Sequence, residues 1–77
     1  MEMKDYLEKA QQLQRDLLGR LMVDIQTQTE GFTVWVHGPT GEMDSFRFYA
    51  WDGKKDEELG KMHDYAERLL NRNGRKV

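Results

Sequence analysis

A chain of 77 residues without cysteine has room for one small domain, and it excludes disulfide frameworks and thiolate zinc sites. The 12 basic and 14 acidic residues leave a net charge of −2, so no general attraction to nucleic acid is expected. No apolar run approaches the about 20 residues that a membrane-spanning helix needs, and the first residues lack the layout of a signal peptide. We therefore expect a soluble, cytoplasmic protein without a membrane partner.

The first segment has apolar residues at steps of three and four, which predicts an amphipathic helix. These residues are Met3, Tyr6, Leu7, Ala10, Leu13, Leu17 and Leu18. Gly19 can adopt the left-handed conformation that ends many helices, so we expect the helix to end near it.

Residues 21–29 fit two patterns. Leu21 and Ile25 would continue the helical stripe, but residues 21, 23, 25 and 27 also alternate with their neighbours as in a half-buried strand. Valine, isoleucine and threonine prefer a pleated surface, and three strands backed by helices are more stable than two. We predict a strand. The alternative is a longer first helix and an α-β-β-α order.

Phe32–His37 has the highest density of β-branched and aromatic residues and predicts the central strand of a sheet. A two-residue turn at Glu30–Gly31 would place Thr27 opposite Val34 and Ile25 opposite Val36. In this register, all the apolar partners share one face.

Turn residues follow the central strand, and residues 45–51 predict a third strand. Pairing Val36 with Phe46 and Val34 with Phe48 keeps the phenylalanines on the buried face. A second helical stripe then contains Leu59, Met62, Ala66, Leu69 and Leu70. We expect Asn73–Gly74 to close that helix, and residues 72–77 to form a flexible basic tail of the single domain 1–77.

The predicted fold class is α+β, in the order α-β-β-β-α. The sheet is a three-stranded antiparallel meander with both helices on one face. The opposite face then carries five large or charged side chains: Trp35, His37, Arg47, Tyr49 and Trp51. The predicted register places Trp35 opposite Arg47 and Tyr49 opposite Thr33. A helix could still fold over this face and bury it.

An uncovered aromatic face usually marks a contact surface, and Trp, Tyr and Arg often anchor interfaces. We therefore predict a non-enzymatic protein-interaction module. It would form a homodimer through this face or through a strand edge, or bind another protein. A ligand pocket around Trp35, Tyr49 and His37 is a weaker alternative.

Catalytic and metal chemistry find little support in the sequence. The two histidines, His37 and His63, are not spaced with other ligands for a zinc site, and no cofactor motif is present. Ser45, the single serine, has no glycine elbow around it. We expect no catalytic residue, metal or cofactor.

The order α-β-β-β-α and Gly53-Lys54-Lys55 before the last helix resemble a double-stranded-RNA-binding domain. The resemblance implies that Lys54 and Lys55 contact phosphates, with Lys61 a further candidate. A nucleic-acid site would also draw on the basic end of the chain: Arg72, Arg75 and Lys76. The sequence departs from that family because Asp56, Glu57 and Glu58 follow the lysine pair.

Overall fold

The computed structural model describes residues 2–74, which form an α-β-β-β-α fold. The elements in chain order are α1 (Met3–Asp16), β1 (Met22–Gln28), β2 (Gly31–His37), β3 (Met43–Tyr49) and α2 (Lys55–Gly74). The predicted order is confirmed, and the ambiguous stretch 21–29 contains a strand. The alternative with a longer first helix is therefore wrong.

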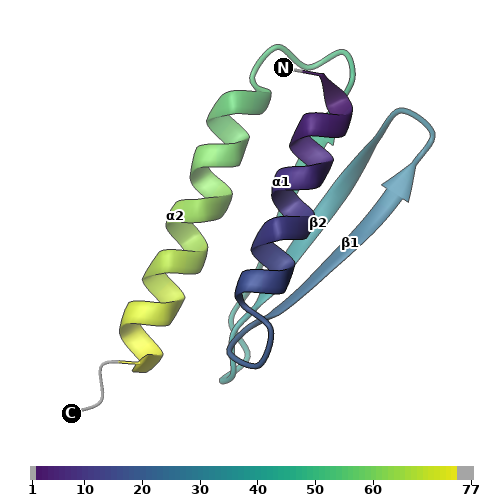
Figure 1. Cartoon of the computed structure of the whole chain (residues 1–77). Helices are drawn as coiled ribbons and strands as arrows, with labels where there is room; N and C mark the ends of the chain where they lie inside the picture. The colour runs from purple at the N-terminus through teal and green to yellow at the C-terminus, as the bar shows by residue number, and fades with distance from the viewer. Residues whose placement is uncertain (1, 75–77) are drawn as a thin grey trace.

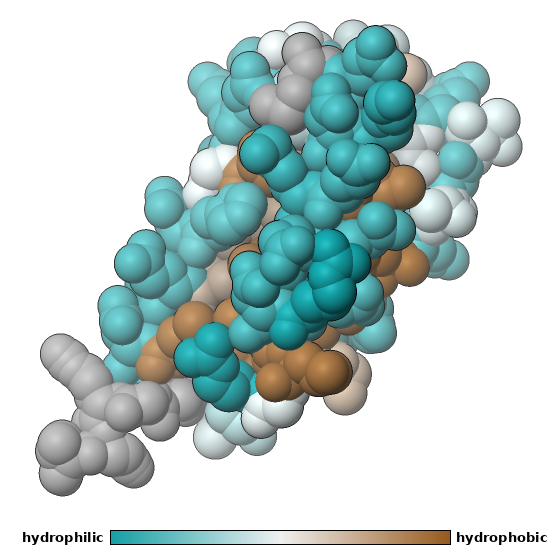
Figure 2. Space-filling view, in the orientation of Figure 1, coloured by the Kyte–Doolittle hydropathy of each residue, from teal (hydrophilic) through white to brown (hydrophobic). Residues whose placement is uncertain are grey.

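The three strands form an antiparallel meander in the order β1-β2-β3. Both helices cover the same face of this sheet, with α1 beside α2 in front of the strands (Figure 1). From this side, the surface is mostly hydrophilic, with apolar side chains visible between and beside the helices (Figure 2).

The core lies between the sheet and the two helices. We call this side of the sheet the inner face. The strands contribute Val23, Phe32, Val34, Val36, Phe46 and Phe48. The helices and the segment after α1 contribute Tyr6, Ala10, Leu13, Leu17, Leu21, Met62, Ala66 and Leu69. These are the apolar positions that the strand and helix periodicities selected, so the two faces of the sheet were assigned correctly.

The predicted registers are each wrong by two residues. Ile25 pairs with Val34 rather than Val36, and Val34 pairs with Phe46 rather than Phe48. A shift of two preserves the side of the sheet on which each residue lies, because side chains alternate with a period of two. The faces are therefore correct although the pairs are not.

The position of Gly31 explains the two-residue shift in the pairing of β1 with β2. It is the first residue of β2 and not part of the turn, which consists of Thr29 and Glu30. A Cβ at position 31 would collide with the carbonyl oxygen of Phe48 on β3. Glycine is thus needed for the close approach of two strands.

The third strand begins and ends two residues earlier than predicted. The chain turns after Tyr49, where Asp52 N–H donates to its carbonyl at 3.0 Å, so Ala50 and Trp51 lie in a turn. The end of α1 follows the expectation more closely, because Gly19 has a φ of +89°. Leu18, however, is 81% exposed and lies outside the core.

A polar contact at each end of α2 ties this helix to distant parts of the chain. The Tyr6 hydroxyl donates to Asp56 at 2.6 Å and joins the first turns of the two helices. This bond raises the pKa of Tyr6, because it stabilises the protonated phenol beside a carboxylate. At the other end of α2, the Arg72 guanidinium lies 3.4 Å from the Glu42 carboxylate in the β2–β3 loop.

Glu42 organises that loop. Its carboxylate accepts the Thr40 hydroxyl at 2.6 Å and the Thr40 N–H at 3.0 Å. The Thr40 hydroxyl, the backbone N–H groups of Glu42 and Thr40 and, to a smaller extent, Arg72 lower the pKa of Glu42 to about 2. The carboxylate lies so close to Gly38 that a Cβ there would collide with it.

The expected basic tail is only partly described. Helix α2 continues to Gly74, so residues 72–74 belong to the helix. Residues 75–77 lie outside the described residues, and the flexible tail stays a prediction for them.

Candidate functional site

The candidate site is the outer face of the sheet, opposite the helices. Neither helix lies on this side (Figure 1). The alternation of side chains assigns twelve strand residues to it. They are Met22, Asp24, Gln26, Gln28, Gly31, Thr33, Trp35, His37, Met43, Ser45, Arg47 and Tyr49. The other possibility, that a helix folds over this face, does not occur in residues 2–74.

The observed registers change the neighbours that the sequence predicted. Trp35 lies between Asp24 and Ser45, and it is not opposite Arg47. Arg47 is opposite Thr33, and Tyr49 is opposite Gly31 rather than Thr33. The predicted aromatic cluster is therefore spread over the face, with apolar groups at two ends and Trp35 and Arg47 between them.

One end of the face lies where β3 ends. The rings of Tyr49 and Trp51 are stacked, with centroids 4.6 Å apart and planes within 3° of parallel. Trp51 is nevertheless 65% exposed because it lies in the turn after the strand. Its other ring face therefore remains available for a contact.

At the opposite end of the face, Met22, His37 and Met43 form one row across the three strands. Met22 is 60% exposed and Met43 is 55% exposed. Sequence reasoning missed both methionines because they stand at strand ends. Their position in the same alternating set as Trp35 was the signal that could have identified them.

The middle of the outer face is polar and closely packed. Thr33 is only 3% exposed although no helix covers it, and Trp35 is half-buried among its strand neighbours. Asp24 Oδ2 lies 3.5 Å from His37 Nε2. The face thus has apolar groups at both ends and charged and polar groups, including Arg47, between them.

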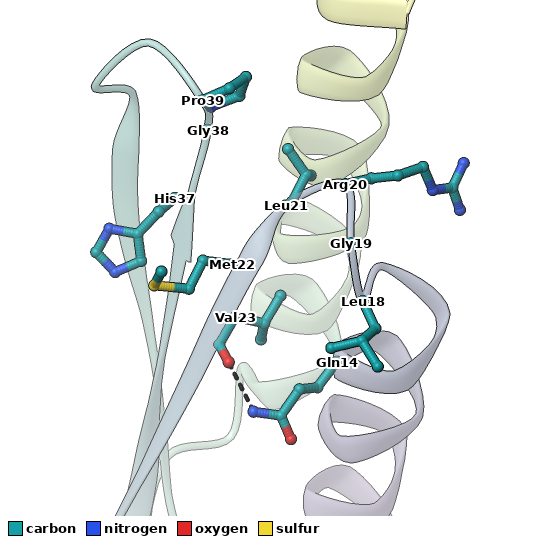
Figure 3. A pocket seen from close by; sticks show the side chains of 10 residues that line it. All are labelled: Gln14, Leu18, Gly19, Arg20, Leu21, Met22, Val23, His37, Gly38 and Pro39. Atoms are coloured by element: carbon teal, nitrogen blue, oxygen red, sulfur yellow. Dashed lines mark hydrogen bonds between the residues drawn. The ribbon is translucent and has the colours of Figure 1, made fainter.

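A shallow pocket lies beside the start of β1, between α1 and the β2–β3 loop (Figure 3). The Gln14 side-chain amide donates to the Val23 carbonyl oxygen at 2.6 Å. Leu18 lies at the same edge, whereas His37 and Met22 lie on the far side of the strand (Figure 3). Of the three residues that the weaker ligand hypothesis used, this pocket contains His37 but neither Trp35 nor Tyr49.

The basic residues of the nucleic-acid alternative do not form one patch in the described chain. Lys54 and Lys55 lie at the start of α2, and Arg72 lies 17 residues further along the helix, which is about 26 Å away. Lys55 donates to the carbonyl oxygens of Asp52 and Ala50, and Arg72 contacts Glu42. Positions 75 and 76 lie outside the described residues.

The remaining candidates bring no further chemistry together. His63 lies exposed on α2, where its Nδ1 is 3.0 Å from the Leu59 carbonyl oxygen. Among residues 2–74, no three His, Cys, Asp or Glu side chains are grouped to hold a metal ion.

Neither described helix has the length and apolar character to cross a bilayer. Comparisons with protein-family models, curated proteins and solved structures gave no match to this chain.

Proposed function

We propose that this chain is a non-enzymatic protein-interaction module that self-associates by packing the outer faces of two sheets together. The observation that carries the proposal is the uncovered face itself: Met22 and Met43 on it, and Trp51 in the turn beside it, are all more than half exposed. Large apolar side chains gathered on one face of a small domain favour contact with another surface.

The arrangement of the face is self-complementary. A two-fold axis parallel to β2 would place β1 of one copy over β3 of its partner. Met22 would then meet the partner's Met43, and Gln26 would meet the partner's Arg47. The two copies of Trp35 would meet at the axis. Met22 and Trp35 therefore face apolar groups, Tyr49 faces the partner's Gln28, and His37 meets its own copy on the axis. No carboxylate faces another carboxylate, and Arg47 does not face its own copy.

The size of the face sets the expected strength. Three strands of seven residues cover on the order of 300 Å² per copy in projection. Two such faces bury less than the roughly 1,200–2,000 Å² of a standard stable interface. We therefore expect weak, micromolar association, anchored by the methionines and Trp51.

Sedimentation velocity across a concentration series tests the proposal. Met22→Lys should weaken association because it places a charge against the partner's Met43. Met22→Lys combined with Met43→Glu should restore it, because each lysine would then face a glutamate of the partner. Leu18→Lys is the matched control, since Leu18 is exposed but lies off the face.

Trp51→Ala should also raise the dissociation constant, while the melting temperature should change little. A wild type that is monomeric at every concentration would overturn the proposal. Equal association of the wild type and Met22→Lys would overturn it as well. A titration with duplex RNA, duplex DNA and single strands in the same experiment would show whether nucleic acid is the partner instead.

A further inference from the structure

The two edges of the sheet differ in their backbone groups. On β3, the Ser45 N–H donates to the Asp44 carboxylate at 2.8 Å, and the Arg47 N–H donates to the Glu58 carboxylate of α2 at 3.4 Å. Residues two apart on an antiparallel strand direct their backbone groups to the same side. Both amides therefore lie on the edge away from β2, where carboxylates occupy the positions that the carbonyl groups of an incoming strand would need.

The β1 edge is protected less, because its one side-chain cap is an uncharged amide. The Val23 carbonyl oxygen points away from β2 and accepts the neutral Gln14 side chain (Figure 3). By the same alternation, Ile25 and Thr27 direct their backbone groups outward. In residues 2–72, no side chain bonds to the backbone groups of Ile25 and Thr27, so the Gln14 amide on Val23 is the one cap that an incoming strand would displace. Asp24 is the single charged residue of the strand.

We propose that β1 pairs with β1 of a second copy, in antiparallel orientation, to form a continuous six-stranded sheet. This contact goes beyond the packing of outer faces, because it uses the backbone of an edge and not the side chains of a face. The two contacts therefore respond to different variants.

The charge of Asp24 and the number of residues that can pair favour one register between the two copies of β1. A two-fold axis at Ile25 pairs all seven residues of the strand and places Asp24 opposite the partner's Gln26. A shift that centres the axis on Asp24 would place two carboxylates directly opposite each other, which is destabilising. A shift the other way, to Gln26, would pair only residues 24–28. With the axis at Ile25, the half-buried Ile25 side chain would also pack against Ile25 of the second copy.

The blocked β3 edge limits strand pairing to two copies. Each protomer has one edge that accepts a strand, so an isologous pair satisfies both copies and leaves no open end. The outer strands of the dimer would be the two copies of β3, with their carboxylate caps.

Thr27→Pro tests the pairing. Proline removes an outward N–H and leaves the β1–β2 hydrogen bonds in place, which is the position where an edge strand tolerates it. Thr29→Pro is the matched control, because Thr29 is also exposed but lies in the turn outside β1. We expect Thr27→Pro to raise the dissociation constant about tenfold or more, the effect of losing a few backbone hydrogen bonds, and Thr29→Pro to leave it unchanged.

Cysteine cross-linking gives a second readout that does not depend on that variant folding. The chain has no cysteine, so Ile25→Cys introduces a single thiol. On the axis the two Cα atoms would lie about 5.5 Å apart, within the range of a disulfide. Gln28→Cys is the control, because in this register its two copies are separated by about 20 Å along the strands. Ile25→Cys should cross-link much faster under mild oxidation.

Equal association of Thr27→Pro and the wild type, or equal cross-linking of the two cysteine variants, would overturn the β1 pairing. If Met22→Lys weakened association while Thr27→Pro and the cysteine variants gave those equal results, the outer-face proposal would stand and the edge proposal would fall. If Met22→Lys left association unchanged while Thr27→Pro and the cross-linking gave the expected results, the edge proposal would stand and the outer-face proposal would fall.

Discussion

Replacing Phe48 with alanine tests the assignment of the inner face most directly. Phe48 is fully buried, with its ring stacked on Phe32 at a centroid distance of 4.8 Å and tilted against Tyr6 at 6.0 Å. Burial of a side chain of this size contributes about 1.5–3 kcal/mol. Each aromatic contact adds about 0.5–1.5 kcal/mol.

These contributions bracket the loss of about 3–5 kcal/mol that truncation of a buried phenylalanine causes in other proteins, and we expect that loss for Phe48→Ala. A domain of 77 residues has a total stability of about 4–12 kcal/mol. Because about 1 kcal/mol corresponds to 4–8 °C in a domain of this size, the melting temperature should fall by about 12 °C or more. The variant should be partly or largely unfolded at 37 °C.

Thermal and urea unfolding followed by circular dichroism measure this loss. Trp51→Ala is the control, because it removes a larger aromatic side chain that is 65% exposed. It should cost no more than about 1 kcal/mol. A cooperative Phe48→Ala melt within a few degrees of the wild type would refute the packing of Phe48 in the core and the assignment of the two faces.

Three further changes probe the close approach of two strands at Gly31, the turn after α1 and the β2–β3 loop. Gly31→Ala should lower stability by about 1–3 kcal/mol, read from urea midpoints, because its Cβ meets the Phe48 carbonyl oxygen and one of the two strands must move. Gly19→Ala should cost about 1–2 kcal/mol from its φ of +89° alone, since no neighbouring atom obstructs the new methyl group. The pKa of Glu42 is lowered from 4.5 to about 2 in the folded chain, so its stabilisation is complete above about pH 4.5 and should be lost as the pH falls toward 2. Thr40→Ala should shrink that loss, and urea midpoints that fall equally in both proteins between pH 5 and 2 would contradict this role of the loop.

Periodicity was enough to predict the elements and the faces of this fold. The alternation of Val23 with Asp24, or of Phe48 with Arg47, assigns each residue to a side of the sheet whatever strand lies opposite. It does not determine a shift of two residues, because apolar groups meet apolar groups in either register. The observed register follows from the close approach at Gly31, a tertiary constraint that has no sequence pattern.

For the candidate site, too, the side of the sheet was predicted correctly but the neighbours of each residue were not. The five selected residues are on or beside the outer face, but the wrong register separated Trp35 from Arg47 and the turn placed Trp51 beyond the strand. Lys55 could not be interpreted from sequence alone, because its bonds to the carbonyl oxygens of the β3–α2 connection depend on the path of that loop.

The meander also determines the order in which contacts can form during folding. Each strand pairs with its neighbour in the sequence, so both hairpins close short loops at little entropic cost. The hydrogen bond between Tyr6 and Asp56 instead spans 50 residues and needs both helices in place. We expect it to form after the main barrier to folding. A contact of that kind changes the folding rate little, but it lengthens the lifetime of the folded state by slowing the separation of the two helices.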